Sequence, residues 1–343
     1  SVPVLPIQKD MYGNELLTKV KTVIEAVTGD LRIDDPTNKS GLRKDSFPEF
    51  PIFSSFEDSY AYYDKKAINN GIYDRGRFSF HLQPFEIDSL DNYTGKGLAF
   101  AGTFESAGIF PTFDDTLRLQ ADYSLGFTRK TPNNGFEIYG GKAKYHNDIH
   151  LSHKGLKGSG DFEYLSARAS AEEIFFFPDS TTLYTQTFAI DEVISGIEFP
   201  QVSNTETYAH FMPYKDRLEV DKRKDEFELY NGQASFNGNL LMQPTGVTGI
   251  GIMKLDKAEV NSSLFTYNAS WFGSDKASLN VYESGGAIAF KANNLRTHID
   301  MKMREGVFHS NGAGSFVELP ANQYICYIDK LKWAMDEELL TLG

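Results

Sequence analysis

The amino-acid sequence predicts an all-β fold built from repeats: a β-solenoid or long curled double sheet with units of about 90 residues and one N-terminal helix. Two observations favour this fold class. From about residue 45 onward, short runs rich in Phe, Tyr, Val, Ile and Thr are separated by Gly, Pro, Asn and Asp, as in strands joined by turns. In addition, segment 136–160 returns without a gap as segment 227–251, 91 residues later. Such self-similarity at a fixed period indicates stacked units.

The first 44 residues form a different region, which we expect to be a helix and loop that cap the array. Asn14 can cap the helix N-terminus, and Gly29 stands where a left-handed C-terminal residue is favoured. Between them, apolar residues recur at helical spacing: Leu16, Leu17, Val20, Val23, Ile24 and Val27. Such a stripe is more often buried on a neighbouring β-structure than used to recruit a partner.

Three landmarks divide the remaining chain into repeat units. The first is the segment 136–160 with its copy, in which aromatic, alanine and glycine positions recur. The second is an aromatic pair at alternating positions, and the third is a Gly-Ile-x-Phe-Pro-like run at 108–111, 196–200 and 286–290. The predicted boundaries are 45–135, 136–226 and 227–315, and residues 316–343 begin a truncated fourth unit. A repeat that stops within a unit suggests a segment of a larger protein.

Tandem β-sandwiches are the alternative architecture, because about 90 residues with seven or eight strands also suits an immunoglobulin-like domain. That arrangement requires a linker between units and a separate core in each. Residues 220–230 run without a Pro- or Ser-rich linker into the next predicted strand, and the chain has no Cys-Trp-Cys arrangement. The sequence therefore favours stacked units.

Composition excludes several classes of partner. The net charge of -13 and the lack of a basic patch argue against sequence-independent binding of nucleic acid. No run of about 18 apolar residues exists, so we expect no transmembrane helix. The lone Cys326 lies in an apolar run, which predicts a small buried side chain rather than a disulfide or a nucleophile.

The sequence offers no cofactor, metal or catalytic motif, and we expect a protein that is not an enzyme. His146, His150 and His153 would share one face of a helix, but the segment is predicted to be a strand, and its copy at 237–244 has no histidine. The glycine motifs lack the Gly-Lys-Ser/Thr ending and the following helix of a phosphate-binding loop. Adjacent carboxylate pairs such as Asp114-Asp115 point to opposite faces of a strand.

Aromatic side chains are the remaining candidates for ligand binding. They could stack on sugar rings or line a channel for acyl chains, although in a β-array they more often fill the core. The candidates are Tyr60, Tyr62, Tyr63, Trp271 and Phe272.

The runs 155–164 and 236–251, with their glycine and aromatic spacing, resemble the large repetitive β-rich envelope proteins of Gram-negative bacteria. More distantly they resemble the OstA-type lipopolysaccharide-transport solenoids and the AsmA-like family. The resemblance implies a β-array in the extracytoplasmic envelope, in the periplasm or at the cell surface. In the transport solenoids lipid lies in an apolar interior.

Three functional hypotheses follow. The first is a non-enzymatic scaffold of the bacterial envelope, partnered by the remainder of a larger chain or by other envelope proteins. The second is a module that binds lipid or glycan along an aromatic groove. The third is a polysaccharide-active β-helix enzyme, which would require convergent acids beside a basic residue.

Overall fold

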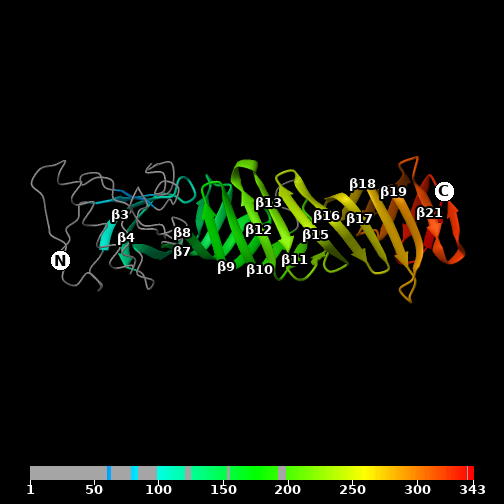
Figure 1. Ribbon diagram of the computed structural model, residues 1–343, viewed down its shortest axis with the longest axis horizontal. Helices are drawn as coiled ribbons and strands as arrows, with labels where there is room; N and C mark the ends of the chain where they lie inside the picture. The colour runs from blue at the N-terminus through cyan, green and yellow to red at the C-terminus, as the bar shows by residue number, and fades with distance from the viewer. Residues whose placement is uncertain are drawn as a thin grey trace, which may run out of the picture. The chain divides into compact units, whose positions relative to one another are not determined.

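The structure is a computed structural model that describes residues 60–62, 79–83, 99–119, 125–152, 155–191, 198–337 and 339–343 (Figure 1). The all-β expectation is confirmed there: the described residues form antiparallel strands, two short 3-10 turns and no α-helix. The helix predicted between Asn14 and Gly29 lies outside these ranges, as does Tyr63. The chain divides into two compact parts, one comprising 1–160 with 173–179 and the other 161–172 with 180–343.

The first part begins as a meander in which β1 to β4 pair consecutively. Its later strands use a different arrangement, because β5 and β6 both pair with β7, one on each half of that long strand. The strands are β1 (Tyr60–Tyr62), β2 (Ser79–Leu82), β3 (Ala99–Glu105), β4 (Phe113–Leu119), β5 (Leu125–Lys130), β6 (Phe136–Ile138) and β7 (Ala143–Ser152). Two further strands, β8 (Gly155–Tyr164) and β9 (Ala167–Phe177), contribute residues to both parts.

The second part continues with long strands, which follow one another in sequence order from β15 to β19 (Figure 1). Its elements are β10 (Ser180–Ile190), β11 (Val202–Asn204), β12 (Thr207–Met212), η3 (Pro213–Lys215), β13 (Arg217–Lys222), β14 (Phe227–Leu229), β15 (Ala234–Gln243), β16 (Gly246–Leu255), β17 (Ala258–Tyr267), β18 (Trp271–Tyr282), β19 (Ile288–Asp300), β20 (Glu305–Ser310), β21 (Phe316–Leu319), η4 (Pro320–Asn322), β22 (Tyr324–Cys326), β23 (Lys330–Ala334) and β24 (Leu339–Leu342).

Short strands separate the groups of long strands and are arranged as two pairs. β10 faces both β11 and β12, which pair in turn with β14 and β13, and both of these pair with β15. The same arrangement follows β19: it faces β20 and β21, which pair with β23 and β22. In both places the hairpin between the second and third short strand contains a proline-led 3-10 turn that ends in a left-handed residue, Asp216 or Gln323.

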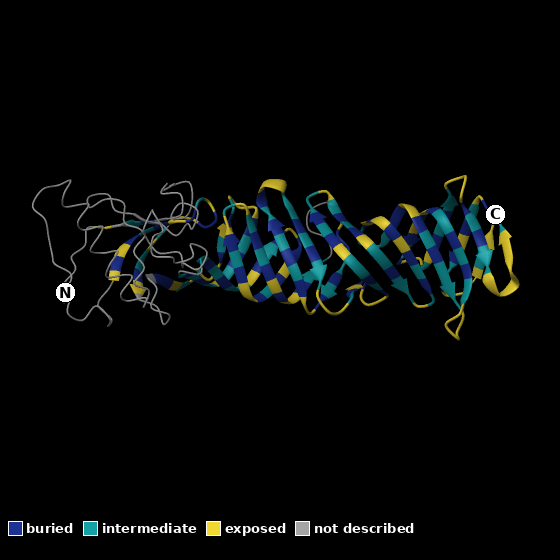
Figure 2. Ribbon diagram, viewed as in Figure 1, coloured by how far each residue is buried: buried dark blue, intermediate teal, exposed yellow. Residues whose placement is uncertain are grey.

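Alternation along the strands explains why they form a packed sheet. Buried and more exposed residues alternate along most strands, as the banding in Figure 2 shows. In the second part, Phe211 of β12 lies 4.8 Å from Tyr164 of β8 and 5.4 Å from Phe162, measured between ring centroids. These strands do not pair with each other, so the sheet folds back and its aromatic face closes on itself.

The two glycine-rich copies use glycine for the same packing purpose. A Cβ at Gly158 would lie 2.9 Å from Phe176 and would also contact Tyr145; a Cβ at Gly249 would lie 3.0 Å from the Phe236 and Tyr267 rings. The ring pairs are T-shaped in both copies, with centroids 5.0 Å apart in the first and 5.7 Å in the second. These glycines lie within strands rather than at corners, and they leave room for a T-shaped pair of rings.

Candidate ligand-binding site

Trp271 and Phe272 begin β18 and point to opposite faces of the sheet. Phe272 is fully buried and packs against Tyr230 and Phe265, so it belongs to the core. Trp271 is half-buried and lines a surface cavity. Of the other predicted aromatic residues, Tyr60 and Tyr62 lie in β1, where the structure describes only the backbone.

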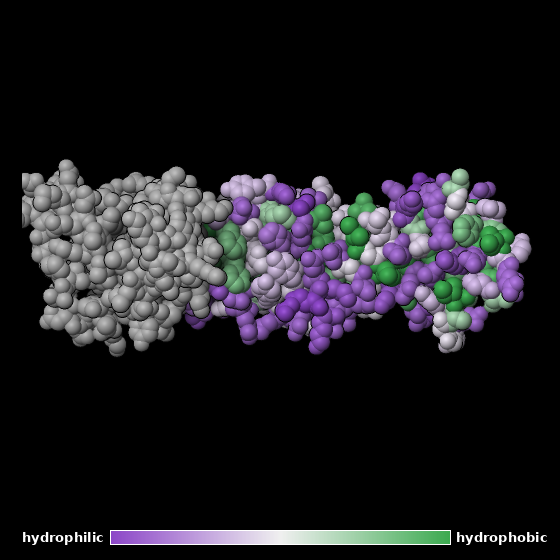
Figure 3. All heavy atoms as spheres, viewed as in Figure 1, coloured by the Kyte–Doolittle hydropathy of each residue, from purple (hydrophilic) through white to green (hydrophobic). Residues whose placement is uncertain are grey.

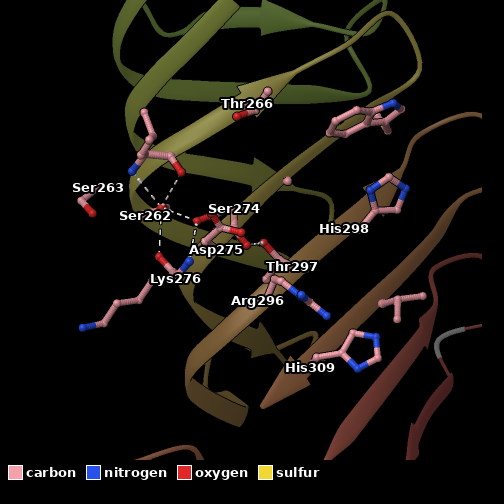
Figure 4. Close-up of a pocket in the computed structure, with 14 residues that line it drawn as sticks. Ser262, Ser263, Thr266, Ser274, Asp275, Lys276, Arg296, Thr297, His298 and His309 are labelled. Atoms are coloured by element: carbon pink, nitrogen blue, oxygen red, sulfur yellow. Dashed lines mark hydrogen bonds between the residues drawn. The ribbon is translucent and has the colours of Figure 1, made fainter. Parts of the chain in front are cut away.

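The cavity lies on the outer face of β17 to β20 and has a volume of about 750 Å³, within the range of small-ligand sites. Besides Trp271, its polar and charged lining includes Asp275, Lys276, Arg296, Thr297, His298 and His309. Register places three of these together: Arg296 and His298 alternate along β19, and His309 of β20 is opposite Arg296. In Figure 4 Arg296, His298 and His309 lie on one side of the pocket, while Ser263 and Lys276 extend on the other.

A local break in strand pairing hollows the sheet at this point. β17 and β18 pair at Ser262 with Ala277 and again at Thr266 with Gly273, and the residues between them leave the ladder. β18 and β19 also shift register between Ser274 and Ala277. Such bulges bend a strand and re-aim its side chains.

Buried hydroxyl groups replace the missing ladder hydrogen bonds. The Oγ atoms of Ser262 and Ser274 are 2.7 Å apart, and each accepts a backbone N–H at 3.0 Å, from Leu264 and Lys276 respectively (Figure 4). Thr297 Oγ1 donates to the Ser274 carbonyl at 3.4 Å. The hollow is therefore a hydrogen-bonded feature of the fold.

Arg296 differs from the other arginines that the structure describes. Arg129, Arg168, Arg217 and Arg304 form ion pairs, Arg223 stacks on Tyr184, and Arg118 has a partner of its own. Among the described residues the exposed Arg296 guanidinium has no such partner, although the chain carries a net charge of -13. On the coloured part of the face shown in Figure 3, hydrophilic residues alternate with apolar patches.

Trp271 lines two cavities. In the first cavity the His298 ring packs against it, with centroids 4.9 Å apart. Trp271 and Thr266 also line a second cavity of about 440 Å³, whose other residues include Gln243, Thr245, Thr248 and Asn268. Both cavities thus combine an aromatic surface with hydrogen-bonding side chains.

Two buried polar atoms in the residues of this second cavity lack a hydrogen-bond partner within the described structure: Tyr267 Oη and Asn268 Oδ1. Burial, with a smaller effect from Tyr230, raises the pKa of the Tyr267 phenol well above its usual value, so this phenol stays protonated and able to donate.

The histidines of segment 146–153, which the sequence assigns to a strand and not to a metal site, are described only in part. His146 and His150 lie in β7, and His150 Nδ1 is 2.9 Å from Thr128 Oγ1, while His153 lies outside the described ranges. No group of three or more potential metal ligands occurs in the described part of the chain.

The expectation that Cys326 is buried is wrong, since it is half-buried at the end of β22. Its neighbours Tyr324, Ile325 and Tyr327 are 57%, 57% and 82% exposed. Apolar composition alone does not place the run in the core, because within the described structure β22 pairs on one side only, with β21.

Sequence reasoning identified Trp271 but missed Arg296, His298 and His309. These residues are separated by turns, and only the register of β18 to β20 brings them together. The sequence signal at this site is segment 271–276, in which an aromatic residue at the start of a strand is followed by small and polar residues. This signal does not indicate which residues of other strands lie beside it.

No protein-family model matches the chain, and no similar curated protein or solved structure was found. Within the described ranges, no helix has the length and apolar character needed to cross a membrane.

Proposed function

We propose that the chain is a non-enzymatic β-scaffold made of stacked repeat units and is a segment of a larger protein of the bacterial envelope. The observation that carries the proposal is the junction between 136–226 and 227–315. β13 precedes the junction, yet its residues Leu218 to Asp221 pair with Met242 to Asn239 of β15, which follows it. Main-chain hydrogen bonds that cross a junction favour stacked units over separate sandwiches.

Recurring backbone geometry supports the same proposal. Tyr139 and Tyr230 both have φ of 54°, and each is followed by two more left-handed residues. The backbone N–H of Tyr139 donates to the Ile109 carbonyl, and the backbone N–H of Tyr230 donates to the Gln201 carbonyl. These equivalent turns stand 91 residues apart, as the sequence repeat requires.

Within the described structure, the second edge of β22 pairs with no strand, and its position in the fold supports the proposed repeat architecture. β22 occupies the place that β13 has in the earlier group of short strands, and β13 uses its second edge to pair with the next long strand, β15. β24 pairs with β23 as β15 pairs with β14. An exposed apolar edge strand can pair with another strand. We propose that a further repeat unit or an envelope partner supplies that strand.

The interior and the cavity bear on the two alternatives. Inward-facing side chains such as Phe211, Phe236 and Phe265 are fully buried, so they occupy the space that an acyl chain would need. Within the described structure, Asp275 is the one acidic residue lining the larger cavity and Glu198 the one lining the smaller, so neither cavity holds the pair of carboxylates that glycosidases use. Scaffolding with glycan binding is therefore favoured over lipid transport and over hydrolysis.

An excised repeat unit tests the proposal. A stacked unit separated from its neighbours loses part of its sheet pairing, so 227–315 expressed alone should lack a cooperative unfolding transition that the full chain shows. Circular dichroism and urea unfolding measure this. A cooperative transition in the isolated segment would favour independent sandwiches.

The envelope assignment rests on the resemblance in glycine and aromatic spacing, and it needs a separate experiment. In the organism that makes this protein, protease added to permeabilised outer membranes should digest it while cytoplasmic markers survive. Protection until the inner membrane is lysed would contradict an extracytoplasmic location.

A further inference from the structure

We propose that the two cavities lined by Trp271 form one binding site for an anionic oligosaccharide, with Trp271 as the stacking surface and Arg296 as the principal contact for the acidic group. This inference is independent of the scaffold proposal, since it concerns the outer face of β16 to β20 and not the stacking of units.

The shape of the site favours an extended ligand. Trp271 and Thr266 line both cavities, so a single chain-like molecule that contacts Trp271 can extend into both. Volumes of about 750 and 440 Å³ each lie in the range that accommodates small ligands. A linear saccharide has the length to occupy both, whereas a single small anion would occupy only the cationic end.

The chemistry of the walls favours a sugar. The C–H face of a pyranose is apolar and slightly positive, and it packs on the negative face of an indole. His298 packs against Trp271 and holds the ring in place. Sugar hydroxyls need donors and acceptors, which Gln243, Thr248 and Asn268 provide in the smaller cavity. The Glu198 carboxylate also lines this cavity and can accept from a sugar hydroxyl, so the acidic group of the ligand belongs in the larger cavity.

The charge at the other end favours an acidic group on that sugar. Arg296 has no protein partner within the described structure, and the imidazoles of His298 and His309 lie on the same side of the pocket (Figure 4). A guanidinium binds carboxylate or sulfate through paired N–H donors. Lys276 stands at the opposite rim, and Asp275 can accept from a sugar hydroxyl.

Four probes separate the sources of negative charge and the role of the sugar. An oligogalacturonate carries carboxylates, a sulfated dextran oligomer carries sulfates, and a neutral malto-oligosaccharide of equal length carries neither. Inorganic polyphosphate serves as a non-sugar anion. Trp271 and Trp333 are the two tryptophans of the chain, so the Trp333→Phe variant reports Trp271 fluorescence alone.

We expect at least one acidic oligosaccharide to bind saturably, to shift Trp271 emission, and to bind about tenfold or more tightly than the neutral one, which corresponds to about 1.4 kcal/mol. The carboxylate and sulfate arms then identify the acidic group. Trp271→Ala and Arg296→Gln should each weaken binding about tenfold, and Arg296→Lys should weaken it less than Arg296→Gln.

Lys224→Gln provides the matched control, because it removes the same charge from an exposed residue that lines neither cavity. It should leave binding unchanged. Urea unfolding of each variant checks that it folds. If Trp271→Ala is destabilised, the Arg296 variants still test the proposal, because Arg296 is exposed and its substitution should not disturb folding. The proposal would be overturned if neither acidic probe bound, or if Lys224→Gln weakened binding as much as Arg296→Gln. It would also be overturned if polyphosphate bound as tightly as the acidic sugars and its affinity did not change in Trp271→Ala.

Discussion

Gly158 and Gly249 show how a single residue type sets the packing of both copies. Each lies within a strand, below a T-shaped pair of aromatic rings, and any side chain there would meet those rings. The sequence indicated that these glycines permit close approach. It could not show what approaches, because Tyr145 and Phe176 come from two other strands.

Alanine at Gly249 should lower the free energy of unfolding by about 1–3 kcal/mol, because its Cβ would lie 3.0 Å from Phe236 and Tyr267. Urea unfolding measures the change. Gly285→Ala is the matched control, since nothing lies within 4 Å of its Cβ position. Equal stability of both variants would contradict the packing role of Gly249.

The tyrosine hydroxyls of the two copies should respond oppositely to removal. Tyr145 donates to backbone carbonyls, including that of Ser159 at 3.0 Å, so Tyr145→Phe should cost about 1 kcal/mol. Tyr267 Oη is buried without a partner in the described structure, so Tyr267→Phe should be neutral or stabilising. Thermal unfolding of both variants tests this contrast, and a larger loss for Tyr267→Phe would contradict it.

At the scale of elements, the sequence predicted the β class but underestimated strand length. β15 to β19 contain 10 to 13 residues each. Glycines interpreted as breaks, such as Gly238 and Gly249, lie inside strands, because tertiary packing accepts residues that local propensity disfavours. The candidate site depends on register between β18, β19 and β20, so it could be predicted only at Trp271.

The break between β17 and β18 should depend on its buried hydroxyls. Ser262→Ala removes the acceptor for the Leu264 N–H and the contact with Ser274, and it should cost about 1–3 kcal/mol. Ser263→Ala, at the exposed neighbour, should change stability by less than about 0.5 kcal/mol. Chemical unfolding distinguishes them, and equal small effects would mean that the hydroxyls do not hold the hollow.

The Glu226–Lys254 ion pair joins the start of β14 to β16 and should make stability depend on pH. Burial acts to raise the Glu226 pKa, but hydrogen bonds from Lys254 and Ser235 and the Lys254 charge outweigh it, so the pKa falls below 4.5. The stabilisation is complete above the ordinary pKa and is lost as pH falls through the folded-state pKa. Both side chains are partly exposed, which limits it to about 1 kcal/mol.

Urea unfolding of Glu226→Gln across acidic and neutral pH tests this pair. The variant should be less stable than the parent at neutral pH and should approach the parent as the Glu226 carboxylate is protonated. Glu228→Gln, an exposed neighbour in β14, is the control. A Glu226→Gln deficit that stays constant down to strongly acidic pH would show that charge is not the cause.

At the scale of the whole molecule, a scaffold of stacked units requires sheet pairing that continues across the junction between residues 226 and 227. The repeat could be recognised in the amino-acid sequence because its aromatic and glycine positions recur at one spacing. The pairing of β13 with β15 could not be predicted from the sequence. The two strands lie on either side of β14 in the chain, and their pairing leaves no local sequence pattern.

Native-state hydrogen exchange on the intact chain under mild denaturant tests that requirement most directly. The amides of Leu218 to Asp221 in β13 and Asn239 to Met242 in β15 face each other across the junction. If the units share one sheet, both sets should open with the same free energy and the same denaturant dependence. Separate opening, with β13 exchanging while β15 remains protected at the global level, would contradict the stacked scaffold.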